Sequence, residues 1–228
     1  MNTSSQPVWL ITGAAGALGQ ALVEQVMTSS AECIALDRDQ RSLEAMHDRL
    51  VASTGRAPLL LPLDLVGAGP DDYDELARTI ESEFGRLDVL VHNAAMFSAL
   101  RPIEHQLPDE WMKVLQTGLT GPWLLTRALL PMLRSTDNAK LVFISDRHCL
   151  EKPANWGAYG LSQAGREWLV KALASELGRR GPDVLDIDPG PFYSRLRAAA
   201  WPVATPDELP TAQAAALKLM EQIEKGVQ

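Results

Sequence analysis

Three glycines near the start of the chain have the spacing of an anion-binding turn. Gly13, Gly16 and Gly19 follow an apolar run that begins at Val8, and a helical pattern of apolar residues comes next. A strand, a tight glycine turn and a helix form the unit with which α/β proteins bind a pyrophosphate. Here Gly13 allows the sharp turn, Gly16 lets the pyrophosphate approach the backbone, and Gly19 lets the helix pack closely on the strand. The alternative is an ordinary glycine-rich turn.

An acidic residue follows the turn at the distance expected of a ribose ligand. Asp37 comes directly after the apolar run Cys33–Leu36. A carboxylate at this place accepts a hydrogen bond from the ribose 2′-hydroxyl of NAD, and its charge repels the 2′-phosphate of NADP. Arg38 has the opposite charge and would pair with that phosphate. The pattern therefore favours NAD, with NADP less favoured; in the alternative, Asp37 and Asp39 form only a solvated turn.

Apolar runs and helical periodicities alternate along the whole chain. Strands are predicted from Val8 and over Cys33–Leu36, Leu59–Leu63, Leu87–His92, Lys140–Ser145 and Val184–Ile187. Helices are predicted after the turn, over Ser42–Leu50 and Asp71–Phe84, from about Pro108, and over Gly157–Arg180 and Pro210–Glu224. This alternation predicts an α/β fold of the Rossmann type, a doubly wound parallel sheet with helices on both faces. The strand order 3-2-1-4-5-6 places Pro62 on an edge strand, where a proline is tolerated.

Length and composition limit the classes of function. We expect residues 1–228 to form a single domain with a sizeable core. The chain has 29 acidic and 21 basic residues, a net charge of −8 and no basic cluster, so neither nucleic acid nor a membrane surface is an expected partner. The first basic residue is Arg38, which argues against a signal peptide. Cys33 and Cys149 lack the spacing of a metal site or a disulfide, which fits a reducing cytoplasm.

Several segments together resemble the classical short-chain dehydrogenase/reductase family, over residues 6–205. Thr12–Gly19 resembles its T-G-x-x-x-G-x-G motif, Gly85–Ala95 its fourth-strand segment ending in N-N-A-G, and Pro189-Gly190 with Ser194 its P-G-x-x-x-T element. Ala154–Tyr159, A-N-W-G-A-Y, resembles a bacterial subgroup of oxidoreductases in this family. The resemblance implies hydride transfer between a nicotinamide cofactor and a carbonyl or alcohol substrate. Family members usually add a seventh strand, for which the end of this chain offers no evident segment.

The resemblance also extends the candidate cofactor site. Asp64, in the sequence L-D-L, matches the acidic residue that contacts adenine in the family, and Ser194 matches the residue that holds the nicotinamide amide. The candidate cofactor-binding residues are Gly13, Gly16, Leu18, Gly19, Asp37, Arg38, Asp64, Leu65, Asn93, Ala94, Pro189, Gly190 and Ser194.

The residues that carry the family's chemistry are largely replaced. The family works with an Asn, a Ser, a Tyr and a Lys. Tyr159 is present, but Asp146 stands at the serine position, Gln163 at the lysine position and Gly118 at the asparagine position. Tyr159, Asp146 and Gln163 are therefore the candidate catalytic residues of a degenerate site.

These replacements are expected to make Tyr159 a poorer general base. A tyrosine has a pKa of about 10, so roughly one in a thousand is phenolate at pH 7. A lysine would lower that pKa, whereas Gln163 has no charge and an ionised Asp146 would raise it. Loss of a positioned acid or base costs about 10²–10⁴ in rate. We expect a weakly active or specialised oxidoreductase; the alternatives are an inactive nucleotide-binding scaffold and a non-redox lyase or isomerase.

The neighbours of Asp146 offer further possibilities. Arg147 and His148 would replace the missing charge if they turned into the pocket, and Asp188 would form a carboxylate pair with Asp146. In the alternative, Asp146 pairs with Arg147 and His148 lies on the surface. Cys149 is expected to be an inert buried thiol.

Two predicted helices have more apolar bulk than one buried face requires. The residues concerned are Trp111, Leu115, Leu119, Trp123 and Leu130, and Leu161, Trp168, Leu169 and Leu173. The surplus indicates a partner surface, and the resemblance implies a two-fold homodimer built by these helices. The segments 96–106, 147–156 and 191–205 are expected to line the substrate pocket, with enough Trp, Phe and Leu for a partly apolar small molecule.

Overall fold

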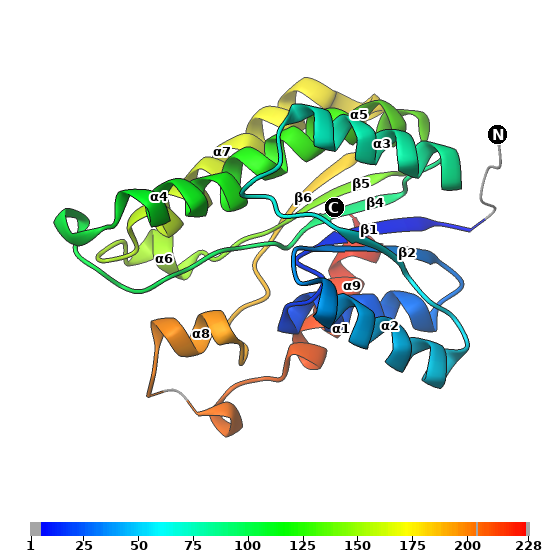
Figure 1. Ribbon diagram of the computed structural model, residues 1–228. Helices are drawn as coiled ribbons and strands as arrows, with labels where there is room; N and C mark the ends of the chain where they lie inside the picture. Colours follow the sequence, from blue (N-terminus) through cyan, green and yellow to red (C-terminus); the bar gives the residue numbers. More distant parts are fainter. Residues whose placement is uncertain (1–5, 204, 227–228) are drawn as a thin grey trace.

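Six parallel strands form the sheet in a computed structural model that describes residues 6–203 and 205–226. The strands are β1 (Val8–Thr12), β2 (Glu32–Asp37), β3 (Leu59–Pro62), β4 (Val89–His92), β5 (Lys140–Ile144) and β6 (Asp183–Ile187). Their order is β3-β2-β1-β4-β5-β6, so the predicted arrangement is confirmed (Figure 1). Pro62 ends the edge strand β3, opposite Asp37, and its side chain is exposed.

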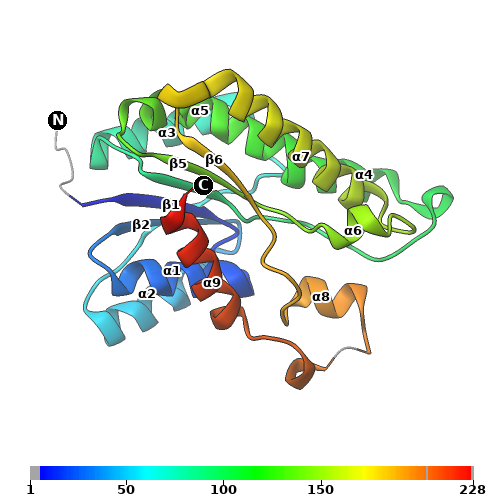
Figure 2. The same ribbon diagram turned by 180° about the vertical axis from the view of Figure 1, so that it is seen from behind.

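Helices cover both faces of the sheet (Figures 1 and 2). One face carries α1 (Ala17–Thr28), α2 (Gln40–Thr54) and α9 (Ala212–Lys225), and the other carries α3 (Pro70–Phe84), α5 (Gly121–Ser135) and α7 (Gly157–Leu177). Helix α4 (Pro108–Leu115) precedes α5, and two short helices, α6 (His148–Glu151) and α8 (Arg195–Ala200), lie beyond the carboxyl ends of β5 and β6. Short 3-10 turns complete the described part at Ile103–His105, Gly178–Arg180 and Pro206–Glu208.

Each face of the sheet has its own apolar core. Leu10 and Leu90 pack toward α3 and α5, whereas Ile11 and Val91, the next residues of the same strands, pack toward α1 and α9. Successive side chains of a strand point to opposite faces, so strands covered on both sides are apolar at nearly every position. This explains why the sequence shows continuous apolar runs at the central strands.

The long helix predicted from Pro108 is interrupted. A π-helical turn at Gln116–Thr120 separates α4 from α5, and it has Gly118 at its centre. A π-turn inserts one extra residue into a helix and is frequent at functional sites. Helix α7 ends at Leu177, three residues before the predicted end, because Gly178 has a φ of 57° and breaks the helical backbone. Helices α6 and α8 are too short for a periodic signal.

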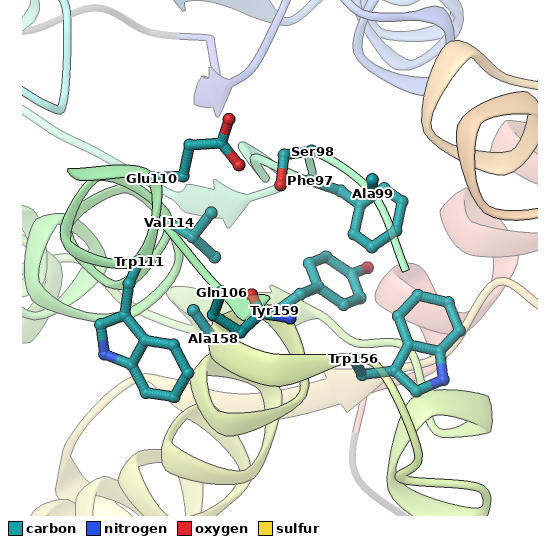
Figure 3. A pocket seen from close by; sticks show the side chains of 10 residues that line it. All are labelled: Phe97, Ser98, Ala99, Gln106, Glu110, Trp111, Val114, Trp156, Ala158 and Tyr159. Atoms are coloured by element: carbon teal, nitrogen blue, oxygen red, sulfur yellow. The ribbon is translucent and has the colours of Figure 1, made fainter. Parts of the chain in front are cut away.

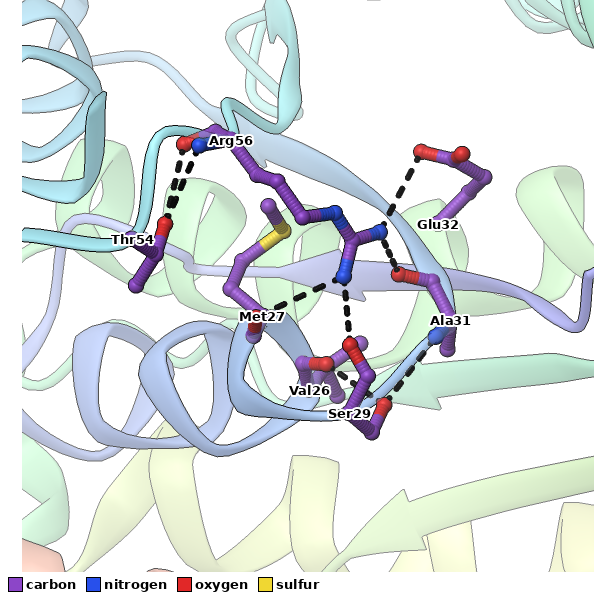
Figure 4. Close-up of polar contacts among 7 residues, drawn as sticks. All are labelled: Val26, Met27, Ser29, Ala31, Glu32, Thr54 and Arg56. Carbon is purple, nitrogen blue, oxygen red and sulfur yellow. Dashed lines mark hydrogen bonds and ion pairs between the residues drawn. The ribbon is translucent and has the colours of Figure 1, made fainter.

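The half-buried side chain of Arg56 joins three segments on the β2 side of the sheet. Its guanidinium donates hydrogen bonds to the carbonyl oxygens of Met27, Ser29 and Ala31, at the end of α1 and in the turn to β2, and forms an ion pair with Glu32 (Figure 4). Arg56 itself lies between α2 and β3. The side chain therefore ties the far end of the α1 unit to the edge of the sheet. Within the described residues, no helix has the length and apolar character needed to cross a membrane.

Candidate functional site: a cleft at the carboxyl edge of the sheet

A single cleft of about 1120 Å³ runs along the carboxyl ends of the strands. The glycine turn and the end of β2 line one part of it, and α7 and α8 line the other. Every predicted site residue lines this cleft except Gly19. Their convergence follows from topology, because the carboxyl ends of parallel strands lie at one edge of the sheet.

The glycine turn has the geometry that its sequence predicts. Gly13 has a φ of 67°, and a Cβ atom there would lie 2.8 Å from the Cα atom of Ala94. A Cβ atom on Gly19 would lie 2.1 Å from the carbonyl oxygen of Gly13, so Gly19 serves the packing of α1 against the turn and lies behind the cleft. Gly16 precedes α1, and its own N–H donates to the carbonyl oxygen of Gly13. The amino end of α1 has no side-chain cap, so the N–H groups of its first turn are the donors that an anion would use.

Thr12 and Asn93 hold the turn in place from β1 and β4. The Thr12 Oγ1 donates to the carbonyl oxygen of Val91 and accepts from the backbone N–H groups of Asn93 and Ala94, at 3.0 Å each. The Asn93 side-chain amide donates to the carbonyl oxygens of Thr12 (2.9 Å) and Gly13 (3.1 Å). The Asn93 amide nitrogen thus supports the turn.

Asp37 lies directly beside the turn. Its Oδ2 accepts a hydrogen bond from the backbone N–H of Ala15, and its Oδ1 accepts one from that of Asp39, both at 3.0 Å. These bonds fix the carboxylate at the part of the cleft where β2 ends. Arg38 also lines the cleft, with an exposed side chain.

The neighbouring residues of β3 and β6 complete the lining. Asp64 accepts from the backbone N–H of Val66 (3.1 Å), and Leu65 beside it is buried. After β6, the Oδ1 of Asp188 accepts from the N–H of Gly190 at 2.7 Å. Ser194 caps α8, and its hydroxyl oxygen accepts from a backbone N–H while its own hydrogen remains available.

The three candidate catalytic residues are in direct contact. The Tyr159 hydroxyl donates to Oδ2 of Asp146 at 3.3 Å, and the other oxygen of Asp146 accepts from the backbone N–H of His148. The Gln163 side-chain oxygen accepts from the backbone N–H of Asp146 at 3.1 Å. Gln163 therefore positions the segment that carries Asp146, a role that differs from that of a charged lysine.

Burial and nearby negative charge raise the pKa values of Tyr159 and Asp146. Burial, followed by the charge of Asp146, raises the pKa of Tyr159 well above its ordinary value, in the direction predicted from the sequence. Burial also raises the pKa of Asp146, and the nearby carboxylate of Asp188 raises it further. A neighbouring carboxylate disfavours the ionised form of Asp146, which is the direction that the sequence-based hypothesis of an Asp146–Asp188 pair implies for this residue.

The structure corrects the expectations for the residues after Asp146. Arg147 is exposed outside the cleft with its Nη2 3.8 Å from Oδ2 of Asp186, so it neither pairs with Asp146 nor enters the pocket. His148 does line the cleft, with its ring 5.1 Å from that of Trp201. Cys149 is buried, which raises the pKa of its thiol to about 12, and the thiol donates to the carbonyl oxygen of Asp146.

Aromatic rings surround Tyr159 on its other sides. The rings of Phe97 and Trp156 each lie 5.5 Å from that of Tyr159 (Figure 3). The ring of Trp201, from the end of α8, lies 5.3 Å from that of Trp156. The site is thus polar on the side of Asp146 and apolar on the side of these rings.

The π-turn packs against α7 where the family's asparagine would lie. A Cβ atom on Gly118 would lie 2.7 Å from Oγ and 2.9 Å from Cβ of Ser162. The Ser162 hydroxyl donates to the carbonyl oxygen of Tyr159 at 2.7 Å. Ser162 therefore fills the space that a side chain at position 118 would occupy.

Sequence reasoning missed three residues close to this cluster. Ser145 lines the cleft, and within the described residues its buried hydroxyl oxygen has no hydrogen-bond partner. The guanidinium of Arg197 lies 3.5 Å from the ring centre of Trp201, also in the cleft. Arg166 is buried beneath Gln163. A signal for Arg166 did exist, because a basic residue seven positions after Tyr159 falls on the same face of the helix.

The chain is similar in sequence to proteins of a known family. A family model described as short chain dehydrogenase matches residues 7–203. The uncharacterized oxidoreductase YciK of Escherichia coli K12 is 33% identical over 202 residues, which is 89% of this chain and 80% of YciK. The chain belongs to the short-chain dehydrogenase family, a family of oxidoreductases.

Solved structures of the family are equally similar. A short-chain dehydrogenase from Shigella flexneri 2a, complexed with NADP, is 33% identical with a TM-score of 0.85, covering 92% of this chain and 87% of that one. One from Escherichia coli CFT073, complexed with NADPH, is 31% identical with a TM-score of 0.91, covering 97% and 91%. The family match and these relatives support NAD(P) as the cofactor of this protein.

Proposed function

We propose that this protein is an oxidoreductase that transfers a hydride between NAD and a small, partly apolar carbonyl or alcohol substrate. The observation that carries the proposal is the continuous cleft, which joins the glycine turn to the hydroxyl of Tyr159. When bound, a nicotinamide cofactor supplies or accepts the hydride. The altered residues around Tyr159 make the protein weakly active or specialised, and its two free, buried cysteines suit a cytoplasmic location.

The cleft has the features that such a cofactor needs. Gly13, Gly16 and Leu18 would hold the pyrophosphate at the uncapped amino end of α1, and Asp64 with Leu65 would contact the adenine. Ser194, with Pro189 and Gly190, would hold the nicotinamide end. Asn93 and Ala94 would keep the turn and the floor of the cleft in place.

The position of Asp37 supports a preference for NAD over NADP. Its carboxylate is fixed beside the turn by two backbone N–H groups, and a 2′-phosphate there would face a negative charge. We expect tighter binding of NADH than of NADPH in calorimetric titration, and Asp37→Ser should reduce the ratio of the two affinities. Equal or tighter binding of NADPH by the wild type would show that Arg38 controls the pocket.

The proton of the reaction comes from the chain itself. In carbonyl reduction, Tyr159 donates its hydroxyl proton to the substrate oxygen, and a protonated Asp146 returns a proton to the phenolate oxygen across the 3.3 Å contact. Because the pKa of Asp146 is raised, this carboxyl group holds a proton at a higher pH than an exposed aspartate. The rate of reduction should therefore fall as the pH rises through the pKa of Asp146.

The first experiment is a turnover assay with NADH and a panel of ketones, diketones and aldehydes, across a range of pH. Hydride transfer that is lost in Tyr159→Phe supports the proposal. Tight binding of NADH without turnover of any carbonyl would instead favour a nucleotide-binding scaffold. Turnover at ordinary enzyme rates, about 1–10³ per second, would contradict the expected impairment.

A second candidate function is proton transfer without hydride transfer. The contact between Asp146 and Tyr159, together with the raised pKa of Asp146, favours a lyase or isomerase that uses this carboxyl group as its acid or base. Product formation without a change in the nicotinamide absorbance would distinguish this function from the first.

We also propose that two chains associate through α5 and α7. Trp123, Leu161 and Trp168 are exposed on these helices, with Trp168 70% exposed. Large apolar side chains that gather on one exposed face of a protein are typical of an interaction surface. A two-fold dimer covers each chain's helices with those of the other chain.

A further inference from the structure

Arg166 is a buried cation with an unusual set of partners. Its side chain is 1% exposed, although it lies in the middle of α7. In the described part of the chain, the hydrogen bonds of its guanidinium all go to main-chain carbonyl oxygens, those of Gly118 (3.0 and 3.2 Å), Ala94 (3.3 Å), His92 (3.4 Å) and Ile144 (2.5 Å). Carbonyl dipoles solvate the charge, and in the described residues no carboxylate forms a direct ion pair with it, although the charge of Asp186 acts on it from β6.

A charge held in this way is costly for the fold. Transfer of a cation from water to the protein interior is unfavourable, and an apolar side chain at such a position often gives a more stable protein. Burial lowers the pKa of Arg166 to about 10, so the guanidinium still carries its charge at neutral pH. Stability alone does not explain why a cation occupies this position.

The carbonyl oxygens that bind Arg166 come from the segments that form the floor of the cleft. His92 ends β4, Ala94 follows it, Ile144 ends β5, and Gly118 is the centre of the π-turn. Ala94 and Ile144 line the cleft. Arg166 thus fixes the ends of two strands and the π-turn relative to one another.

Arg166 also lies on the helical face that carries the candidate catalytic residues. Positions 159, 163 and 166 follow one another on one side of α7. Burial and the charge of Asp146 raise the pKa of Tyr159, and the positive charge of Arg166 acts in the opposite direction. Facing Arg166 itself are Tyr159 and the carboxylate of Asp186 from β6.

The other titratable neighbour of Arg166 is His92. Burial and the charge of Arg166 lower the pKa of His92 well below its ordinary value, so this ring stays neutral and supplies no charge of its own. Arg166 is therefore the cation that acts on the tyrosine from within the fold.

We propose that Arg166 is a positioning residue of the active site. Its guanidinium fixes the floor of the cleft and supplies, from a position two helical turns beyond Tyr159 on the same side of α7, the positive charge that Gln163 does not supply. The effect of Arg166 on catalysis rests on the proposed function. Its effect on the ionisation of Tyr159 does not, because the charge acts on the phenol whether or not a substrate is bound. In this arrangement, the contribution of Gln163 is the hydrogen bond that its side-chain oxygen accepts from the backbone N–H of Asp146.

The test measures the ionisation of Tyr159 directly and needs no turnover. A fluorinated tyrosine, which has a more acidic phenol, is placed at position 159 in the full-length Asp146→Ser protein and titrated by ¹⁹F NMR. Three versions are compared: Arg166, Arg166→Lys and Arg166→Met. Arg134→Met, which removes an exposed arginine from α5, is the matched control.

We expect Arg166→Met to raise the pKa of the fluorinated phenol by about one unit, a tenfold fall in the phenolate fraction at a given pH. Arg166→Lys and Arg134→Met should leave this pKa nearly unchanged. Adding Gln163→Lys to Arg166→Met should restore it, and a purely structural role for Arg166 does not predict that rescue. An unchanged pKa in a folded Arg166→Met protein would overturn the proposal.

Two further outcomes are decisive. If Arg166→Met does not fold, Arg166→Gln is titrated in its place, and failure of both to fold would show that the guanidinium serves the fold alone, which overturns the proposal. The same proteins are then assayed for carbonyl reduction with NADH. A shifted pKa without any turnover would support the role of Arg166 and contradict only the proposed function.

Discussion

At the scale of single residues, Asp146 is the replaced residue whose side chain contacts the hydroxyl of Tyr159. It stands where the family has a serine, and its carboxylate accepts the hydroxyl proton of Tyr159 in a hydrogen bond. A serine would offer a proton to a substrate oxygen, whereas an ionised aspartate can only accept one. The protonation state of Asp146 therefore decides whether the cluster donates or accepts a proton.

The raised pKa of Asp146 predicts a pH-dependent effect on stability. The folded state binds this proton more tightly than the unfolded state does, so wild-type stability falls as the pH rises from the unfolded pKa through the folded one. Asp146→Asn removes that loss. We therefore expect the melting temperature of Asp146→Asn relative to wild type to be higher at pH 8 than at pH 4.

Differential scanning calorimetry at both pH values checks this prediction. Asp64→Asn is the control, because Asp64 lies in the same cleft with an exposed side chain. A constant difference between Asp146→Asn and wild type across this pH range would contradict the raised pKa.

Restoring two of the family's residues should restore activity. Asp146→Ser with Gln163→Lys removes a negative charge from the neighbourhood of Tyr159 and adds a positive one, both of which lower its pKa. We expect NADH-dependent reduction of a carbonyl panel to be at least about tenfold faster than in the wild type. Gln163→Lys alone is the control and should gain little, because Asp146 would pair with the new ammonium group.

At the scale of elements, the turn between β1 and α1 tolerates no side chain at Gly19. A Cβ atom 2.1 Å from a main-chain oxygen forces the helix away from the turn, so Gly19→Ala should cost about 1–3 kcal/mol. The expected fall in melting temperature is about 3–10 °C, with weaker binding of NADH. Gly67→Ala is the matched control, because a Cβ atom there meets no heavy atom within 4 Å and it should change stability by less than about 0.5 kcal/mol.

The sequence predicted the elements well and their irregularities poorly. The strand order followed from two observations. The alternation of apolar runs and helical patterns predicted a doubly wound parallel sheet, and Pro62 indicated that its strand lies at the edge of that sheet. The π-turn at Gly118 could not be predicted, because the periodicity of apolar residues continues through it, and the close packing of Gly118 against Ser162 involves another helix. Arg147 was misplaced for the same reason: its partner, Asp186, is supplied by a distant strand.

At the scale of the whole molecule, the exposed residues of α5 and α7 predict a dimer. Trp168→Glu and Leu161→Glu place charges in the proposed interface, and we expect each to convert a dimer to monomers in sedimentation velocity at micromolar concentration. Leu217→Glu is the control, because Leu217 is 51% exposed on α9, on the opposite face of the sheet. A wild-type protein that sediments as a monomer would contradict the proposed association.

The contact between Gly118 and Ser162 also couples two positions of the site in any redesign. A Cβ atom on Gly118 would lie 2.7 Å from Oγ of Ser162, so an asparagine introduced there requires Ser162 or the π-turn to shift before its amide can reach a ligand. Removal of the Ser162 side chain opens that space but gives up the hydrogen bond to the carbonyl oxygen of Tyr159 within α7. The effects of substitutions at positions 118 and 162 on stability are therefore expected to be non-additive, because the two residues are in direct contact.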